Sequence, residues 1–157
     1  MASPLTVEAL TPSYVPVGFA LREHVFGDGA GGFAQEEDQL GLFFARSNKL
    51  ADRILPLSIH ATAAASFALV GTEDRPGSVV AIGDDRTATY HDGIWSAGPG
   101  EEARRVGPML IHWDRGSVHS LTARSDGLVF AVRGPKALGV TLSELVRVAQ
   151  SLPIASA

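Results

Sequence analysis

The chain has 157 residues, a formal net charge of −4 and no cysteine. This length favours one domain, because a single hydrophobic core typically serves about 100–200 residues. The lack of cysteine excludes disulfides, thiolate metal sites and a cysteine nucleophile, and the presence of only two lysines, Lys49 and Lys136, argues against a nucleic-acid partner.

The N-terminal part of the chain predicts an arm followed by a β-hairpin. Residues 1–12 are expected to form a flexible arm, and their sequence shows no signal peptide. Apolar residues alternate with small or polar ones in Val17–Phe26, which predicts a strand, and Gln39–Ser47 is expected to pair with it. The acidic, Gly-rich segment between them, Gly27–Asp38, is expected to be a long loop.

One stretch has the length of a membrane-spanning helix. From Ile54 to Thr72 there are 19 consecutive residues without Asp, Glu, Lys or Arg. A spanning helix needs about 20 mostly apolar residues, whereas this stretch contains proline, histidine, serine and threonine. We therefore expect no membrane span here, but a strand over Arg53–His60 and a strand or short helix over Ala63–Val70.

The C-terminal part predicts further strands and one helix. The segment from Ser96 to Arg105 is expected to be a polar loop, and Met109–Ala123 a hairpin that turns at Arg115–Gly116. The helix is expected to begin at the N-cap Thr141 and to end before Pro153. The other strands are expected over Ser78–Ile82, Thr87–Tyr90, Ile94–Trp95 and Leu128–Arg133.

These elements predict an α+β domain over residues 13–153 with a short tail, 154–157. Its core would be a curved, mainly antiparallel sheet of about six to eight strands, with the C-terminal amphipathic helix packed on one face. One helix cannot cover both faces of such a sheet. Curvature, a second layer or a partner must cover the rest, and a homodimer is one possibility.

Two sequence patterns have an alternative explanation as ordinary loops. Gly27–Gly32 matches the glycine spacing of dinucleotide-binding loops, but an acidic segment and a strand follow it instead of a helix, so no cofactor is predicted. The paired carboxylates are expected to lie in solvated turns and not to act in acid–base catalysis. These acidic clusters are Glu36–Asp38, Asp84–Asp85 and Glu101–Glu102.

A histidine pair suggests a metal site. A two-residue turn at Arg115–Gly116 would place His112 opposite His119, with Asp114 as the nearest carboxylate. A three-residue turn would break this pairing, and the alternative is two half-exposed histidines on strands.

An aromatic group suggests a ligand pocket. Trp95, Trp113, Tyr90 and Phe44 are candidates to line an apolar pocket or groove. The alternative is ordinary core packing, which is the usual fate of aromatic residues in strands.

Four short motifs follow one another along the chain: Tyr14–Phe19, Val79–Gly83 with Ala88 and Tyr90, Leu110–Trp113, and Leu142–Leu152. This order of motifs resembles a bacterial envelope domain of unknown function. That domain occurs in anti-sigma-factor-like and membrane-anchored proteins and has a half-barrel fold like that of lipoprotein carriers. The departures are the absence of a preceding membrane anchor and the replacement of the usual aromatic residue after the hairpin turn by Val118 or His119.

Three functional hypotheses follow. The resemblance implies a non-enzymatic sensing or protein-interaction domain without catalytic residues. The first alternative is a carrier that holds a lipid or another apolar ligand between the sheet and the helix. The second is a metal-dependent enzyme that uses His112 and His119. The localisation stays open between the cytoplasm and an extracytoplasmic domain whose leader has been removed.

Overall fold

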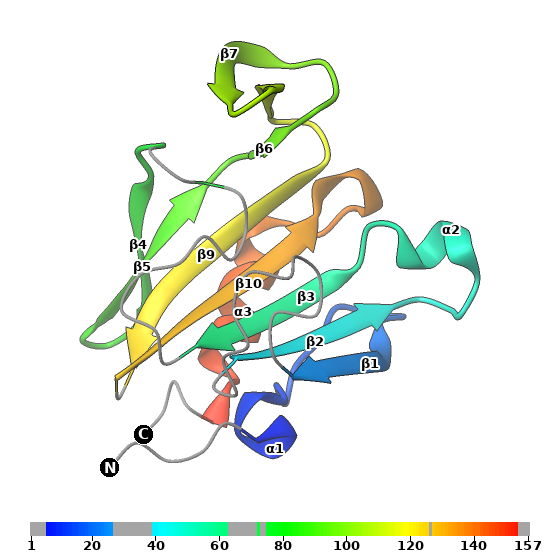
Figure 1. Ribbon diagram of the computed structural model, residues 1–157. Coiled ribbons are helices and arrows are strands. Elements are labelled where there is room, and N and C mark those ends of the chain that lie inside the picture. Colours follow the sequence, from blue (N-terminus) through cyan, green and yellow to red (C-terminus); the bar gives the residue numbers. More distant parts are fainter. Residues whose placement is uncertain (1–5, 27–38, 63–71, 73–74, 126, 154–157) are drawn as a thin grey trace.

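The computed structural model describes residues 6–26, 39–62, 72, 75–125 and 127–153 (Figure 1). Within them the chain forms an α+β fold with two antiparallel sheets and a C-terminal helix. The helical elements are α1 (Val7–Leu10), α2 (Leu50–Arg53), the 3₁₀ turn η1 (Lys136–Leu138) and α3 (Leu142–Gln150). The strands are β1 (Ala20–Phe26), β2 (Gln39–Ala45), β3 (Leu57–Thr62), β4 (Ser78–Gly83), β5 (Arg86–His91), β6 (Ile94–Ser96), β7 (Glu101–Val106), β8 (Met109–Asp114), β9 (Val118–Ser125) and β10 (Leu128–Pro135).

The larger sheet has seven strands in the order β1-β2-β3-β10-β9-β5-β4, and each pair of neighbouring strands is antiparallel. This result confirms the predicted fold class and the predicted pairing of the first two strands. Strands β9 and β10 lie in the middle of this large sheet, so they are paired on both sides.

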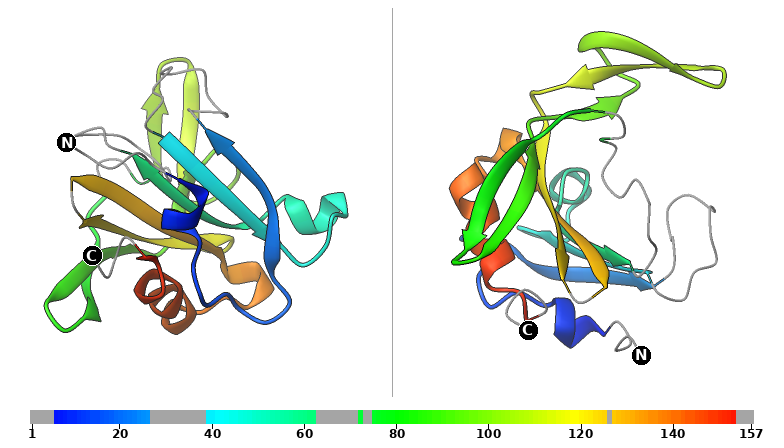
Figure 2. Two further views of the ribbon diagram at one scale, coloured as in Figure 1. Left: turned by 90° about the horizontal axis from the view of Figure 1, so that it is seen from below. Right: turned by 90° about the vertical axis from the view of Figure 1, so that its left-hand side faces the viewer.

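Helix α3 packs on one face of the large sheet (Figure 2). Its start is fixed by the predicted capping box: the Thr141 side chain accepts from the Glu144 backbone N–H, and the Glu144 carboxylate accepts from the Thr141 N–H. The core side chains on α3 and the segment after it are fully buried against the sheet. They are Leu145, Val148, Ala149 and Leu152.

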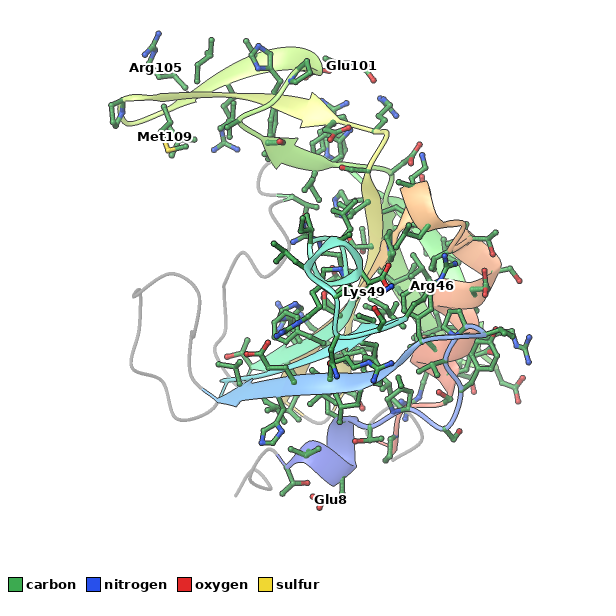
Figure 3. All side chains as sticks on the ribbon, turned by 90° about the vertical axis from the view of Figure 1, so that its right-hand side faces the viewer. Glu8, Arg46, Lys49, Glu101, Arg105 and Met109 are labelled. Carbon is green, nitrogen blue, oxygen red and sulfur yellow. The ribbon has the colours of Figure 1, made fainter. Side chains whose placement is uncertain are left out.

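The smaller sheet has the order β6-β8-β7 and forms an arm, which comprises residues 94–114. The arm projects from one end of the large sheet, on the side opposite α3 (Figures 2 and 3). Arg105 and Met109 lie at its far end, and Glu101 lies nearer to the body (Figure 3).

The predicted hairpin over Met109–Ala123 is wrong. Its first half is β8, which pairs with β6 and β7, and its second half is β9, which pairs with β5 and β10. The chain does turn at Arg115–Gly116, where the Asp114 carboxylate accepts from the Gly116 N–H at 2.8 Å and from the Ser117 hydroxyl at 2.7 Å. This turn carries the chain from one sheet to the other.

Other segments differ from expectation in smaller ways. The expected arm over residues 1–12 includes the helical turn α1, and its Leu10 is fully buried in the core. The expected polar loop up to Arg105 contains strand β7, and the turn α2 precedes β3. Among the described residues, no helix has the length and apolar character that crossing a membrane requires. Ala63–Val70 lies outside the described residues.

Lys136 holds the two connections between the arm and the large sheet together. Its ammonium group donates to the Asp92 carboxylate at 2.6 Å and to the Arg115 carbonyl oxygen at 2.8 Å. Asp92 follows β5, and Arg115 precedes β9. The Trp113 indole N–H also donates to the Asp92 carbonyl oxygen at 3.2 Å, which ties β8 to the same point.

Candidate functional site on the polar face of the large sheet

The two faces of the large sheet have different chemistry, because successive side chains on a strand point to opposite faces. In β3, Leu57, Ile59 and Ala61 belong to the core beneath α3. The residues between them therefore point away from α3, and their direct partners on neighbouring strands share that face. We call this surface the polar face; it is defined by Ser58, His60, Thr62, Thr89, His91, Ser120, Thr122 and Arg133.

Arg133 lies at the centre of the polar face. It pairs with Ser58 of β3 on one side and with Ser120 of β9 on the other. Directly opposed residues have Cβ atoms about 4.5–5.5 Å apart, so the three side chains leave the sheet next to one another. The same row continues to Phe43 beyond Ser58 and to His91 beyond Ser120.

The guanidinium group of Arg133 has no counter-ion in the described part of the chain. No hydrogen bond and no ion pair joins its side chain to another described residue. Glu23 pairs with Phe43 in the same row, but its carboxylate binds Arg53 at 3.1 Å. Arg133 is partly buried, and this burial lowers its pKa. A partly buried cation normally has an acidic partner, so an anionic ligand is the natural complement.

Two neighbouring polar atoms are also unsatisfied. Ser120 is fully buried, and no described residue forms a hydrogen bond with its hydroxyl. Nδ1 of the buried His91 likewise has no hydrogen-bond partner among the described residues. The other ring nitrogen of His91, Nε2, donates to the Arg75 carbonyl oxygen at 2.8 Å. Buried polar groups are almost always hydrogen-bonded, so two orphans beside an unpaired arginine indicate a place where a ligand or water binds.

His60 adds a neutral imidazole to the polar face. Burial, followed by the positive charge of Arg133, lowers the pKa of His60 from 6.5 to about 4. Its Nε2 lies 3.1 Å from the Ser58 hydroxyl, and its ring contacts Phe43 edge to face at 5.4 Å. A base with this pKa is weak at neutral pH, and no carboxylate bonds to the imidazole in the described residues. The Ser58–His60 pair therefore lacks the arrangement of a hydrolytic triad.

The four aromatic candidates do not meet in one pocket. Phe44 and Tyr90 pack in the core on the α3 side of the large sheet. Trp95 and Trp113 are direct partners in the arm, with ring centroids 5.4 Å apart, and the guanidinium of Arg75 lies 4.6 Å from the Trp113 ring centroid. The tryptophan pair is thus part of a packed cation–π stack.

The candidate metal ligands lie on strands of different sheets. His112 pairs with Ser96 and Ala103 in the arm, whereas His119 pairs with Gly134 in the large sheet. Both ring nitrogens of His119 are engaged, by Tyr90 at 2.8 Å and by the Val140 carbonyl at 2.7 Å.

Asp114 also has another role. Hydrogen bonds from Ser117 and Gly116 lower the pKa of Asp114, whose carboxylate shapes the turn after β8. Among the described residues no three His, Cys, Asp or Glu side chains cluster as a metal site would require. The expected juxtaposition of His112 and His119 is therefore not formed.

The acidic clusters within the described residues lie at a turn or form ion pairs. Asp84 and Asp85 lie exposed at the turn between β4 and β5. Glu101 forms an ion pair with Arg115, and Glu102 forms one with Arg75 at 2.7 Å. Gly27–Gly32 and Glu36–Asp38 lie outside the described residues.

The tip of the arm is a second surface of interest. Val106, Met109 and Leu110 are exposed to 49%, 54% and 48% at the turn between β7 and β8. Arg105 lies beside them and is also exposed. Three exposed apolar side chains at one hairpin tip are typical of a contact surface.

Reasoning from the sequence missed the central residue of the polar face. The signal was present, because Arg133 directly follows the apolar run Leu128–Val132 in a strand that the structure buries on both faces. Its significance depends on its cross-strand neighbours, which the sequence does not give. A comparison with known proteins found no protein family, no curated protein and no solved structure that matches this chain.

Proposed function

We propose that the protein is a non-enzymatic sensing domain that binds a small anionic molecule on the polar face of its large sheet. The single observation that carries this proposal is the central row of that face. There, a partly buried arginine lies beside the buried hydroxyl of Ser120, and the described residues offer neither a counter-ion to the arginine nor a hydrogen-bond partner to the hydroxyl. A ligand that accepts hydrogen bonds from both groups would satisfy them together.

The surroundings of His60, as far as the structure describes them, support binding over catalysis. The imidazole of His60 has a pKa of about 4, which makes it a poor general base at neutral pH. Its neighbour in the next strand is a glycine, Gly41, and the strand on the other side offers Ala131. Neither residue supplies the acid that would orient a catalytic histidine.

The apolar-carrier alternative receives less support. The side chains of the core itself occupy the interface between the large sheet and α3, where Leu145 and Val148 are fully buried. A Cβ atom at Gly134 would lie only 2.7 Å from Leu145 Cδ2, which shows how closely the helix approaches the sheet. A lipid chain would have to displace these contacts.

Titration of the ¹⁵N-labelled protein with a panel of small anions and neutral molecules tests the proposal. We expect saturable shifts of backbone amide signals in β3, β9 and β10, and an unchanged ligand after prolonged incubation. The Arg133→Gln variant should lose this response, whereas the matched Arg105→Gln variant on the exposed arm should keep it. Conversion of the ligand, or a panel without any saturable response in these strands, would refute the proposal.

A protein-interaction role is a second candidate, favoured by the exposed apolar tip of the arm. We propose a second copy of this chain as the partner, joined tip to tip through Val106, Met109 and Leu110. Sedimentation across a range of protein concentrations would then detect a dimer. The Met109→Glu variant should be monomeric, while Lys49→Glu, an exposed site far from the tip, should still dimerise. A wild-type protein that stays monomeric at every concentration would exclude this candidate.

A further inference from the structure

We infer that the anion is a small monocarboxylate, held by the guanidinium of Arg133 with the hydroxyl groups of Ser58 and Ser120 on either side. This inference rests on the proposed function and adds the chemical class of the ligand. Its basis is the pairing of both serines with Arg133 on the adjacent strands.

The charge of the site favours a ligand with a single negative charge. Arg133 is the one arginine or lysine in the central row of the polar face, which runs from Phe43 to His91. Arg124, which the register also places on this face, is exposed and lies four residues farther along β9 than Ser120. A carboxylate carries one negative charge, which one guanidinium balances. A phosphate dianion would leave an excess negative charge next to partly buried strands, and such a charge is costly without a second partner.

The geometry of the donors also matches a carboxylate. A guanidinium presents two parallel N–H groups in one plane, which fit the two oxygens of a carboxylate. The Ser120 hydroxyl is buried and forms no hydrogen bond within the described part of the chain, so its proton is available to one of these oxygens. The Ser58 hydroxyl lies 3.1 Å from Nε2 of His60, and a hydroxyl that accepts from this nitrogen keeps its own proton for the ligand.

The residues next to Arg133 on the polar face suggest that the rest of the ligand, beyond its carboxylate group, is apolar. Ala131 lies two residues before Arg133 on the same face, and His60 is its direct partner on β3. The edge-to-face pair of Phe43 and His60 adds an aromatic surface on this side of the arginine. Benzoate is therefore a better probe than acetate alone, since it tests the negative charge and the apolar part of the ligand together.

Calorimetric titration at constant ionic strength distinguishes the ligand classes. The probes are acetate, benzoate and inorganic phosphate, with sodium chloride as the background salt. We expect saturable binding of both carboxylates, tighter for benzoate, and weaker binding of phosphate.

Three variants test the donors. Arg133→Gln should weaken carboxylate binding by roughly ten- to one-hundredfold, because a charge-assisted pair is lost. Arg133→Lys should weaken it by about tenfold, because lysine keeps the charge but not the planar fork. Ser120→Ala should weaken it by a few-fold to about tenfold. Its unfolding midpoint should be unchanged or higher, because no hydrogen bond to this hydroxyl from a described residue is lost. Its native stability keeps this variant informative even if the arginine variants fold poorly.

The outcomes separate the two proposals. Phosphate binding that is equal to or tighter than benzoate binding, and that Arg133→Gln abolishes, would overturn the carboxylate inference and leave the anion-binding function standing. Carboxylate binding that is unchanged in Arg133→Gln would overturn the site itself. No binding of any of the three probes above the chloride background would overturn both the inference and the proposed function.

Discussion

The hydroxyl of Tyr90 lies 2.8 Å from Nδ1 of His119, a histidine buried in the large sheet. Nε2 of the same ring lies 2.7 Å from the Val140 carbonyl oxygen, which can only accept, so Nε2 carries the proton. Nδ1 is then an acceptor, and Tyr90 is its donor. The pair links β5 and β9 to Val140, the residue before the N-cap of α3.

Tyr90→Phe should therefore destabilise the protein by about 1–3 kcal/mol, because it leaves a buried ring nitrogen without a donor. Urea unfolding would measure the change in the free energy of unfolding. Tyr14→Phe is the matched control, since the Tyr14 hydroxyl lies 3.5 Å from the Glu144 carboxylate in a partly buried position. The control should lose less than about 0.5 kcal/mol. Equal losses in both variants would contradict a special role for the Tyr90–His119 bond.

Stability should fall as the pH decreases from about 6.5 to about 4. The pKa of His60 is about 4 in the folded protein, below its ordinary value of 6.5, so in this window the unfolded chain binds the proton more readily. The loss from this group should be on the order of 2–3 kcal/mol and should level off below pH 4. Burial also lowers the pKa of His119, which adds to the loss with the same sign.

The His60→Gln variant should show a shallower pH dependence of the unfolding free energy between pH 6.5 and 4. Chemical denaturation at a series of pH values in this range would measure it. A slope identical to that of the wild type would show that His60 is not the group responsible.

Gly134→Ala should separate the C-terminal helix from the sheet. A Cβ atom there would lie 2.7 Å from Leu145 Cδ2 and 2.8 Å from Val140 Cγ1, both of which are buried. Such overpacking typically costs about 1–3 kcal/mol. Gly98→Ala is the control, because the nearest atom to its Cβ would be Ser96 Oγ at 3.6 Å. A thermal unfolding midpoint that drops equally in both variants would refute the close approach at Gly134.

Lys136→Met should loosen the arm without unfolding the body. Its ammonium joins the two connections at Asp92 and Arg115, and both it and the Asp92 carboxylate are partly exposed, so its loss should cost less than about 1 kcal/mol globally. Hydrogen exchange should become faster in residues 94–114 and stay unchanged in β3 and β10. Lys49→Met, at the exposed residue that directly precedes α2, should change hydrogen exchange in neither region. Equally faster hydrogen exchange over the whole chain would contradict the role of Lys136 in holding the arm to the large sheet.

The parts of the fold that the sequence predicted correctly are those that depend on local signals. Helix α3 follows from its capping box and its apolar stripe, both contained within a dozen residues. The strands β2, β4 and β5 follow from apolar and polar alternation bounded by turn residues.

The hairpin failed because its local signal is ambiguous. The turn at Arg115–Gly116 exists, but Trp113 pairs with Trp95 and Val118 pairs with Pro135, and both partners are distant in sequence. A tight turn connects two strands whether they pair with each other or diverge into two sheets. Pairing across the whole chain decides between these cases, and a single sequence does not contain that information.

The candidate site depended on the same missing information. Serine and histidine alternate with apolar residues in β3, so the sequence alone indicates that one side of this strand is polar. The three-strand row that places Ser58, Arg133 and Ser120 side by side exists only once the register is known.

The arm is topologically an enlarged connection between two neighbouring strands. Tyr90 pairs with Leu121 and His91 with Ser120, so the end of β5 lies beside the beginning of β9, and the chain leaves and re-enters the large sheet at almost the same place. Residues 94–114 therefore form a cassette, whose replacement by a short turn would close β5 and β9 into a simple hairpin. Insertions, deletions and grafted sequences in this cassette should spare the rest of the protein, which gives evolution and protein engineering a site where new recognition can be added without rebuilding the sheet.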